Sequence, residues 1–115
     1  MSRDDRAYLL HLLDAISQIE IYLSDISYDD FMASRMHQDA VIRQMEILGE
    51  ATKNISMDIR DQNPDIPWKD IAGMRDILIH QYFGVDLGSV WDSAISDIPA
   101  IKPLLQKLEN QLFPS

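Results

Sequence analysis

Apolar residues recur along the first half of the chain at alternating spacings of three and four residues, the period of an amphipathic helix. The first such stretch predicts a helix over roughly residues 3–26. Its apolar stripe consists of Leu9, Leu12, Ile16, Ile19 and Leu23. Ser34 has the position of an N-cap for a second long helix, which carries apolar residues as far as Ile55. The run SDISYDDF between the two helices interrupts the period and predicts a loop or short turn.

Proline and glycine divide the following part of the chain into shorter pieces. A short helical piece and then a connection are expected before Pro67, because Pro64 does not fit the interior of a helix. Pro67 itself suits the first turn of a helix. The pattern therefore predicts a third helix from about Pro67 to Tyr82 or Phe83, with Gly84 as its terminator.

Two further helices are expected at the end of the chain. Asp86 is placed to cap a fourth helix, and Pro99 is placed to begin a last one. Alternating β-branched runs bounded by turns, the signature of strands, are missing from the sequence. We therefore expect one all-α domain over residues 1–115, an antiparallel bundle of four or five helices.

Composition restricts the chemistry that this domain can perform. The chain has 115 residues and no cysteine, which excludes disulfides and thiolate metal sites. It has no signal-peptide pattern and no apolar run near the roughly 20 residues of a membrane span, so we expect a cytoplasmic protein without a membrane partner. With 19 acidic and 10 basic residues, its net charge of −9 does not attract nucleic acid. Any chemistry on RNA would need a local cationic site or a cationic partner.

The third predicted helix is apolar on more than one side. On a helical wheel at about 100° per residue, Met74 and Leu78 lie within about 60° of Ile71 and form the core face. Measured from Ile71, Ile77 lies at about 240° and Ile79 at about 80°, so a second flank of the helix is also apolar. A small bundle has only one interior. The second flank therefore predicts a symmetric partner, and two-fold homodimers are the commonest solution.

The same helix carries three polar side chains with useful chemistry, Arg75, His80 and Tyr82. Arg75 and Tyr82 share a face, whereas His80 is about 140° from Arg75 around an ideal helix. Three arrangements would bring them together: the long arginine curls around the helix, the helix distorts near its end, or a second protomer completes the site. The ordinary alternatives are an ion pair of Arg75 with Asp70 or Asp76, a histidine at a helix C-terminus, and a packed tyrosine.

The residues around this triplet resemble a known family. The segment RDILIHQYFGVD resembles the R-x4-H-x-Y signature of the HepT-like toxins, a branch of the HEPN superfamily of small helical ribonucleases. Three further blocks resemble the same branch: RQMEILGEATKNIS at 43–56, NPDIPWKDIAGMRD at 63–76 and YFGVDLGSVWD at 82–92. The likeness extends from about Ser34 to Pro99. It implies a five-helix protomer and a homodimer whose cleft carries Arg75 and His80 from both chains.

The resemblance also implies an activity and a partner. Members of this branch cleave RNA internally without a metal, as toxins of type VII toxin–antitoxin systems. They commonly pair with an MntA-like antitoxin, a minimal nucleotidyltransferase that is associated with transfer of AMP to the motif tyrosine, here Tyr82. The residue after the motif arginine is often a polar residue such as asparagine. Here it is Asp76, whose charge is expected to lower the effective positive charge of Arg75.

The residue types suit this chemistry. RNA carries its own nucleophile, the 2′-hydroxyl, so the protein must only move protons and stabilise charge on phosphorus. His80, with an ordinary pKa of about 6.5, can act as base or acid near neutral pH. Arg75 offers a planar, permanently charged set of donors that matches a phosphate. Two protomers would supply two histidines, one as base and one as acid, and no cofactor is required.

Other polar residues complete the list of candidates. Glu46 and Glu50 are four residues apart and, with His80, raise the possibility of a carboxylate–histidine metal site. No Glu-x-x-His repeat accompanies them, so no metal ligand is assigned. Glu50, Lys53 and Asp76 are expected to line the cleft instead, and Glu50 has the alternative of a simple pair with Lys53.

A different class of function competes with the ribonuclease. A helical binding module for a nucleotide or a protein could retain this fold after losing catalysis. The presence of Arg75, His80 and Tyr82 together favours the enzyme. The sequence does not identify the RNA that is cleaved.

Overall fold

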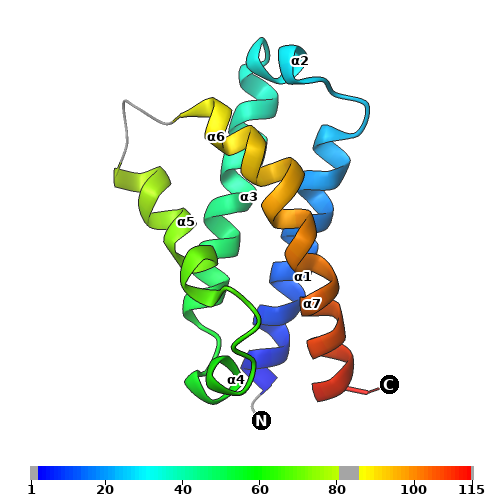
Figure 1. Ribbon diagram of the computed structural model, residues 1–115, viewed down its shortest axis with the longest axis vertical. Coiled ribbons are helices and arrows are strands. Elements are labelled where there is room, and N and C mark those ends of the chain that lie inside the picture. The colour runs from blue at the N-terminus through cyan, green and yellow to red at the C-terminus, as the bar shows by residue number, and fades with distance from the viewer. Residues whose placement is uncertain (1–2, 81–85, 115) are drawn as a thin grey trace.

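The computed structural model describes the backbone of residues 3–80 and 86–114, and the side chains of residues 4–74 and 86–114. The elements in chain order are α1 (Arg3–Leu23), α2 (Tyr28–Met32), α3 (Arg35–Lys53), α4 (Met57–Gln62), α5 (Trp68–His80), α6 (Leu87–Asp92), the π-helix η1 (Ser93–Asp97) and α7 (Ile98–Leu112). They form an elongated bundle of 43 × 29 × 21 Å, with no strand among the described residues (Figure 1). The all-α fold expected from the sequence is confirmed.

Helix α3 occupies the middle of the bundle. It packs against α1 on one side and α5 on the other, while α7 packs against α1 (Figure 1). Successive long helices run in opposite directions, as the expected antiparallel bundle requires. Helix α5, which carries the candidate catalytic residues, therefore lies at an edge of the bundle.

The core lies where α1 packs on α3 and α7 and where α3 packs on α5. Along α1, Leu9, Leu12, Ile16 and Ile19 are at most 1% exposed, so the stripe read from the sequence is buried as expected. The other helices contribute further core side chains, among them Val41, Met45, Leu48, Ile71, Ile98 and Leu105. Within the described residues no helix has both the length and the apolar character needed to cross a membrane.

The segment SDISYDDF was expected to be a loop or turn, and this expectation was only partly right because Tyr28–Met32 form the short helix α2. Ser27 caps the helix: its hydroxyl accepts from the amide of Asp30, and the Asp30 carboxylate accepts from the amide of Ser27. Phe31 is fully buried, with its ring centroid 5.4 Å from that of Trp91. One helical turn is too short to show a period, so capping and an aromatic contact stabilise a helix that the pattern does not reveal.

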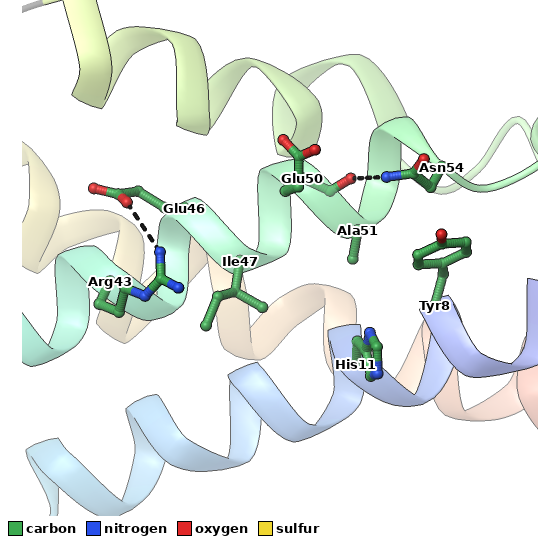
Figure 2. Close-up of a pocket in the computed structure, with 8 residues that line it drawn as sticks. All are labelled: Tyr8, His11, Arg43, Glu46, Ile47, Glu50, Ala51 and Asn54. Atoms are coloured by element: carbon green, nitrogen blue, oxygen red, sulfur yellow. Dashed lines mark hydrogen bonds and ion pairs between the residues drawn. The ribbon is translucent and has the colours of Figure 1, made fainter.

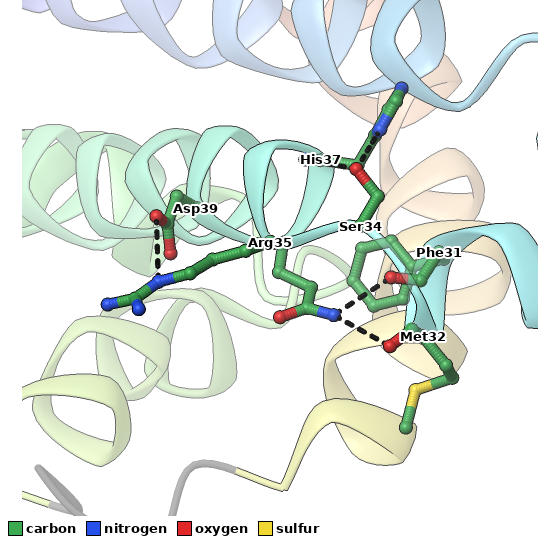
Figure 3. A network of polar contacts seen from close by, with 7 residues as sticks. Phe31, Met32, Ser34, Arg35, His37 and Asp39 are labelled. Atoms are coloured by element: carbon green, nitrogen blue, oxygen red, sulfur yellow. Dashed lines mark hydrogen bonds and ion pairs between the residues drawn. The ribbon is translucent and has the colours of Figure 1, made fainter.

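Polar contacts fasten α2 to the start of α3 (Figure 3). The hydroxyl of Ser34 accepts from the amide of His37 at 3.2 Å, which confirms Ser34 as the N-cap of α3. The same hydroxyl lies 2.6 Å from Nδ1 of His37. Nε2 of Gln38 donates to the carbonyls of Phe31 and Met32 at 3.0 and 3.1 Å. The last turn of α2 and the first turn of α3 are thereby held together.

The fourth and last helices expected from the sequence are joined, which corrects the prediction of a new helix at Pro99. The π-turn Ser93–Asp97 links α6 to α7 without a non-helical residue between them. Pro99 has no amide hydrogen to donate to the carbonyl four residues earlier, and the wider π-turn directly before it lets the helix continue. The expected cap at Asp86 is confirmed, since its carboxylate accepts from the amide of Ser89 at 3.2 Å.

Candidate active site on helix α5

The start of α5 is firmly held in the bundle. Trp68 is 7% exposed, and its indole Nε1 donates to the carbonyl of Asn63 at 3.0 Å. One turn later, Ile71 is 1% exposed, and its amide donates to the carbonyl of Pro67 at 3.1 Å. Trp68 is thus a packing anchor for the first turn of α5. These contacts, together with the packing of α5 on α3, hold the first turns of α5 in place in the bundle.

The backbones of Arg75 and His80 both belong to α5, and His80 is its last residue. A separation of five residues in an α-helix corresponds to about 7.5 Å along the axis and about 140° of rotation. The side chains of Arg75, Asp76 and His80 lie outside the described residues, as does all of Tyr82. The expected end of the helix at Tyr82 or Phe83 also lies outside them. The roles of these four residues therefore stay predictions.

The neighbouring helix α3 carries the other candidates, Glu46, Glu50 and Lys53, at spacings of four and three residues. Figure 2 shows Glu46 and Glu50 along one side of α3. Glu46 Oε2 pairs with Arg43 Nη1 at 3.5 Å. Lys53 is the last residue of the helix. A place for Glu50 and Lys53 in a catalytic cleft, which the sequence suggested, stays a prediction.

Glu50 borders a groove of about 310 Å³ between α1 and α3 (Figure 2). Tyr8 and His11 of α1 form its opposite wall, with ring centroids 6.0 Å apart and ring planes at 85°. Ile47 and Ala51 point from α3 toward α1 and give the groove apolar surface. The groove thus combines an imidazole, a phenol, a guanidinium and carboxylates around an apolar floor.

Tyr8 and His11 were not recognised from the sequence as groove-lining residues. No motif surrounds His11, and Tyr8 shows no unusual spacing. The groove arises because α1 and α3 pack side by side, so the residues that face each other across it are far apart in the chain. Sequence reasoning contained no signal for such a pair.

The acidic and imidazole side chains do not form a metal centre in the described part of the molecule. No group of three or more His, Cys, Asp or Glu is close enough to hold an ion among the side chains of residues 4–74 and 86–114. Glu46 and Glu50 are one turn apart, but His80, the third ligand considered, has its side chain outside that part.

Asp86, six residues after His80 in the sequence, is the N-cap of α6. Its carboxylate accepts from both the amide and the hydroxyl of Ser89, at 3.2 and 3.0 Å. The backbone hydrogen bond from Ser89, followed by that from its hydroxyl, holds the pKa of Asp86 below its ordinary value. The chain that follows the R-x4-H-x-Y motif therefore enters a helix whose first turn is capped by Asp86.

The amino-acid sequence is similar to those of one family of known proteins. A sequence model of the ribonuclease HepT-like family matches residues 12–108. A Thermococcus cleftensis protein named probable ribonuclease HepT is 44% identical over 110 residues, covering 96% of this chain and 100% of that protein. No solved structure matches.

A second relative is longer than this chain. It is a Methanocaldococcus jannaschii protein named gamma-glutamylcyclotransferase and putative RNase, 49% identical over 112 residues. The match covers 97% of this chain and 50% of that protein, so this chain spans about half the length of that relative. Because the family match runs from the first half of α1 into α7 and includes all of α5, this chain belongs to the ribonuclease HepT-like family.

Proposed function

We propose that this protein is a metal-independent endoribonuclease, the toxin of a type VII toxin–antitoxin pair. One observation carries the proposal. This chain belongs to the HepT-like family, and its helix α5 has an arginine and a histidine at the spacing of the family's motif. The relative named probable ribonuclease HepT matches along its entire length, which supports the same class of activity for this chain.

In the proposed reaction, the 2′-hydroxyl oxygen of RNA attacks the adjacent phosphorus. One His80 imidazole removes the proton from that hydroxyl, and the bond from phosphorus to the 5′-oxygen breaks. A second, protonated His80 gives its proton to the departing 5′-oxygen. The products are a 2′,3′-cyclic phosphate and a 5′-hydroxyl, and Arg75 stabilises the negative charge on the phosphoryl oxygens throughout.

This scheme requires two protomers, because each chain has one His80. We place the site at a cleft of a two-fold homodimer, where both α5 helices contribute. Asp76, Glu50 and Lys53 are proposed to line that cleft. Because the net charge of −9 does not attract RNA, the cations of the cleft, Arg75 first among them, would have to bind the substrate phosphate.

Control of the toxin is proposed to act through Tyr82. An MntA-like nucleotidyltransferase antitoxin would transfer AMP from ATP to the phenolic oxygen of Tyr82, releasing pyrophosphate. The product carries a phosphodiester charge and a bulky nucleoside close to His80 in sequence. Negative charge and bulk near a phosphate-binding arginine would exclude RNA.

The deciding experiment measures RNA cleavage by the purified protein and by its His80→Ala and Arg75→Ala variants. Each substitution should lower the cleavage rate by about 100-fold or more, because general acid–base and electrostatic contributions are typically that large. The matched controls are His37→Ala and Arg35→Ala, a histidine and an arginine at the start of α3. Circular dichroism should show the same helical content in all variants.

The competing function is a non-catalytic binding module. It predicts that the wild-type protein binds RNA, a nucleotide or a protein but cleaves no RNA, and that His80→Ala and Arg75→Ala still inhibit growth if the wild type does. Cleavage by the wild type together with its loss in both folded variants would exclude this alternative.

A further inference from the structure

The proposed cleavage reaction leaves the groove between α1 and α3 unexplained. This groove has a volume of about 310 Å³, which is in the range of small-ligand sites, and Ile47 and Ala51 give it an apolar floor (Figure 2). Arg43 and Asn54, which also line it, are separated by about 16 Å along α3. Two aromatic rings lie toward the Asn54 end, and an ion pair lies at the Arg43 end.

The aromatic end of the groove is formed by Tyr8 and His11 of α1. Their ring planes are at 85° with the centroids 6.0 Å apart, so a flat ring that stacks on one of them contacts the edge of the other. Tyr8 is half-buried and His11 is exposed, so both rings are accessible from outside the bundle. Proteins commonly hold an unpaired nucleobase by stacking it on such side chains. A flat aromatic ligand therefore suits this end of the groove.

The opposite end carries an oriented pair of a donor and an acceptor. Oε2 of Glu46 pairs with Nη1 of Arg43 at 3.5 Å, and the two side chains remain 32% and 69% exposed. A guanidinium only donates hydrogen bonds, whereas a carboxylate only accepts them and has two oxygens to do so. The pair thus offers donors on one side and acceptors on the other.

The Watson–Crick edge of guanine has the complementary order. Its O6 accepts, while N1–H and the 2-amino group next to it donate. Adenine has a donating amino group and an accepting N1 at the first two positions, so both would face the wrong partner. Uracil matches only the first two positions, because its third group is an accepting carbonyl. Guanine alone among the four RNA bases matches all three.

We propose that the groove between α1 and α3 binds a guanine base. Arg43 donates to O6, and the Glu46 carboxylate accepts from N1–H and the 2-amino group. The plane of the base lies on Ile47, and the purine stacks toward the aromatic end. Because Glu46 and Glu50 are both acidic, the groove suits the uncharged base of a nucleotide better than its phosphate.

The position of the groove indicates where this guanine lies in the substrate. Glu50 borders the groove, and its helix α3 packs directly on α5, which carries Arg75 and His80. An RNA strand that crosses α3 can therefore have a phosphate at α5 and a nearby base in the groove. This placement on the substrate depends on the proposed ribonuclease activity, whereas binding of guanine depends only on the groove.

Binding is measured by the fluorescence anisotropy of labelled 2′-O-methyl RNA pentamers with the purified full chain. These strands have no free 2′-hydroxyl, so the proposed reaction cannot cleave them. Four positions are adenosine, and the central one is guanosine, inosine or adenosine. The guanosine pentamer should bind at least about 10-fold more tightly than the all-adenosine pentamer. Inosine lacks the 2-amino group and should fall between them, and equal affinities, or no binding, would overturn the inference.

Replacement of Glu46 tests the hydrogen-bonding end. Glu46→Gln should reduce the preference for guanosine at least about 5-fold, because an amide has one accepting oxygen and a donating nitrogen. The matched control is Glu20→Gln, at a glutamate of α1 that pairs with Lys102 of α7 at 2.9 Å. Both variants lose one negative charge, so a general change in affinity for RNA would appear in both. A guanosine preference that survives in Glu46→Gln would contradict the proposal.

Replacement of the rings tests the aromatic end. Tyr8→Leu and His11→Leu keep apolar bulk but remove a flat ring, and at least one of them should weaken binding of the guanosine pentamer by about 10-fold. The control is Tyr28→Leu on α2, whose tyrosine is 46% exposed and should have no effect. Circular dichroism should show the same helical content in all variants. Unchanged affinity in both groove variants would exclude stacking at this site.

Competition by guanosine monophosphate separates two sources of the base. If the groove serves an RNA strand, the free nucleotide should compete much less well than an unlabelled guanosine pentamer, because the strand makes further contacts outside the groove. Equal competition would keep the guanine site but overturn its place on the substrate. Cleavage of RNA without selective binding of guanosine would refute this inference alone. Selective binding by a protein that cleaves no RNA would refute only the ribonuclease.

Discussion

The amide of Ser56 donates a hydrogen bond of 2.8 Å to Oδ1 of Asp5, a residue 51 positions earlier in the chain. Ser56 is the N-cap of α4, and its hydroxyl accepts from the amide of Ile59. In a capping box the residue three positions after the cap would accept the hydrogen of the cap's own amide, but Ile59 has no acceptor. Asp5 of α1 supplies that acceptor, so the first turn of α1 also completes the cap of α4.

Replacement of Asp5 by alanine should therefore destabilise the fold. Asp5 is 4% exposed, and the substitution leaves the Ser56 amide without this acceptor. We expect the free energy of unfolding to fall by about 1–3 kcal/mol, the usual effect of an unsatisfied buried donor. Urea unfolding measures the change. Asp4→Ala, at an exposed neighbour in the same turn, is the control, and an equal loss in both variants would contradict the capping role.

The cap of α6 makes stability depend on pH in a defined direction. Hydrogen bonds from Ser89 lower the pKa of Asp86 below its ordinary 3.8. A carboxyl whose folded pKa is lowered stabilises the protein above its unfolded pKa, and this contribution is lost as pH falls through the folded value. The advantage of wild type over Asp86→Asn should thus be largest above about pH 5 and shrink toward pH 3 and below.

An NMR titration of the Asp86 side-chain carboxyl carbon measures this directly. The pKa should lie below 3.8 in the wild type and move back toward 3.8 in Ser89→Ala, which lacks the donating hydroxyl. A wild-type pKa at or above 3.8 would show that the Ser89 hydrogen bonds do not hold the charged form.

The proposed chemistry predicts that RNA cleavage needs no metal ion. Cleavage should survive EDTA, leave a 2′,3′-cyclic phosphate or its opened form, and stop when the 2′-hydroxyl at the cut site is replaced by hydrogen. Its rate should follow a bell-shaped pH profile, because one histidine must be neutral and the other protonated. Loss of activity in EDTA that added Mg²⁺ restores would point to metal-dependent hydrolysis instead.

Tyr82 should be dispensable for cleavage and necessary for silencing. A phenol with a pKa of about 10 is needed neither for proton transfer near neutral pH nor for holding a phosphate. Tyr82→Phe should cleave RNA like the wild type but remain toxic in cells that also contain an active MntA-like antitoxin. A Tyr82→Phe protein that cannot cleave would place the tyrosine in catalysis or RNA binding. One that is active yet still silenced would favour direct blocking of the cleft.

Local signals predicted much of the fold correctly. The stripe of Leu9, Leu12, Ile16 and Ile19 is buried, and Ser34 and Asp86 are N-caps. Each of these features depends on residues within one or two turns of each other, whose relation is visible in the sequence. The helix α2 was missed because its stability comes partly from the contact of Phe31 with a ring 60 positions later, Trp91.

For the candidate site, the sequence by itself determined the residue types and their spacing in the chain: Arg75, His80 and, two residues later, Tyr82. Helical geometry then sets the separation of Arg75 and His80 along the axis of α5, because it depends on backbone hydrogen bonds within the helix. Only the tertiary structure decided that α5 lies at an edge of the bundle, and that Tyr8 and His11 of α1 share a groove with Ile47 and Ala51 of α3. These relations depend on which helices pack together. The pairing of helices is set by the burial of apolar area over the entire chain, so it cannot be read from any short stretch of sequence.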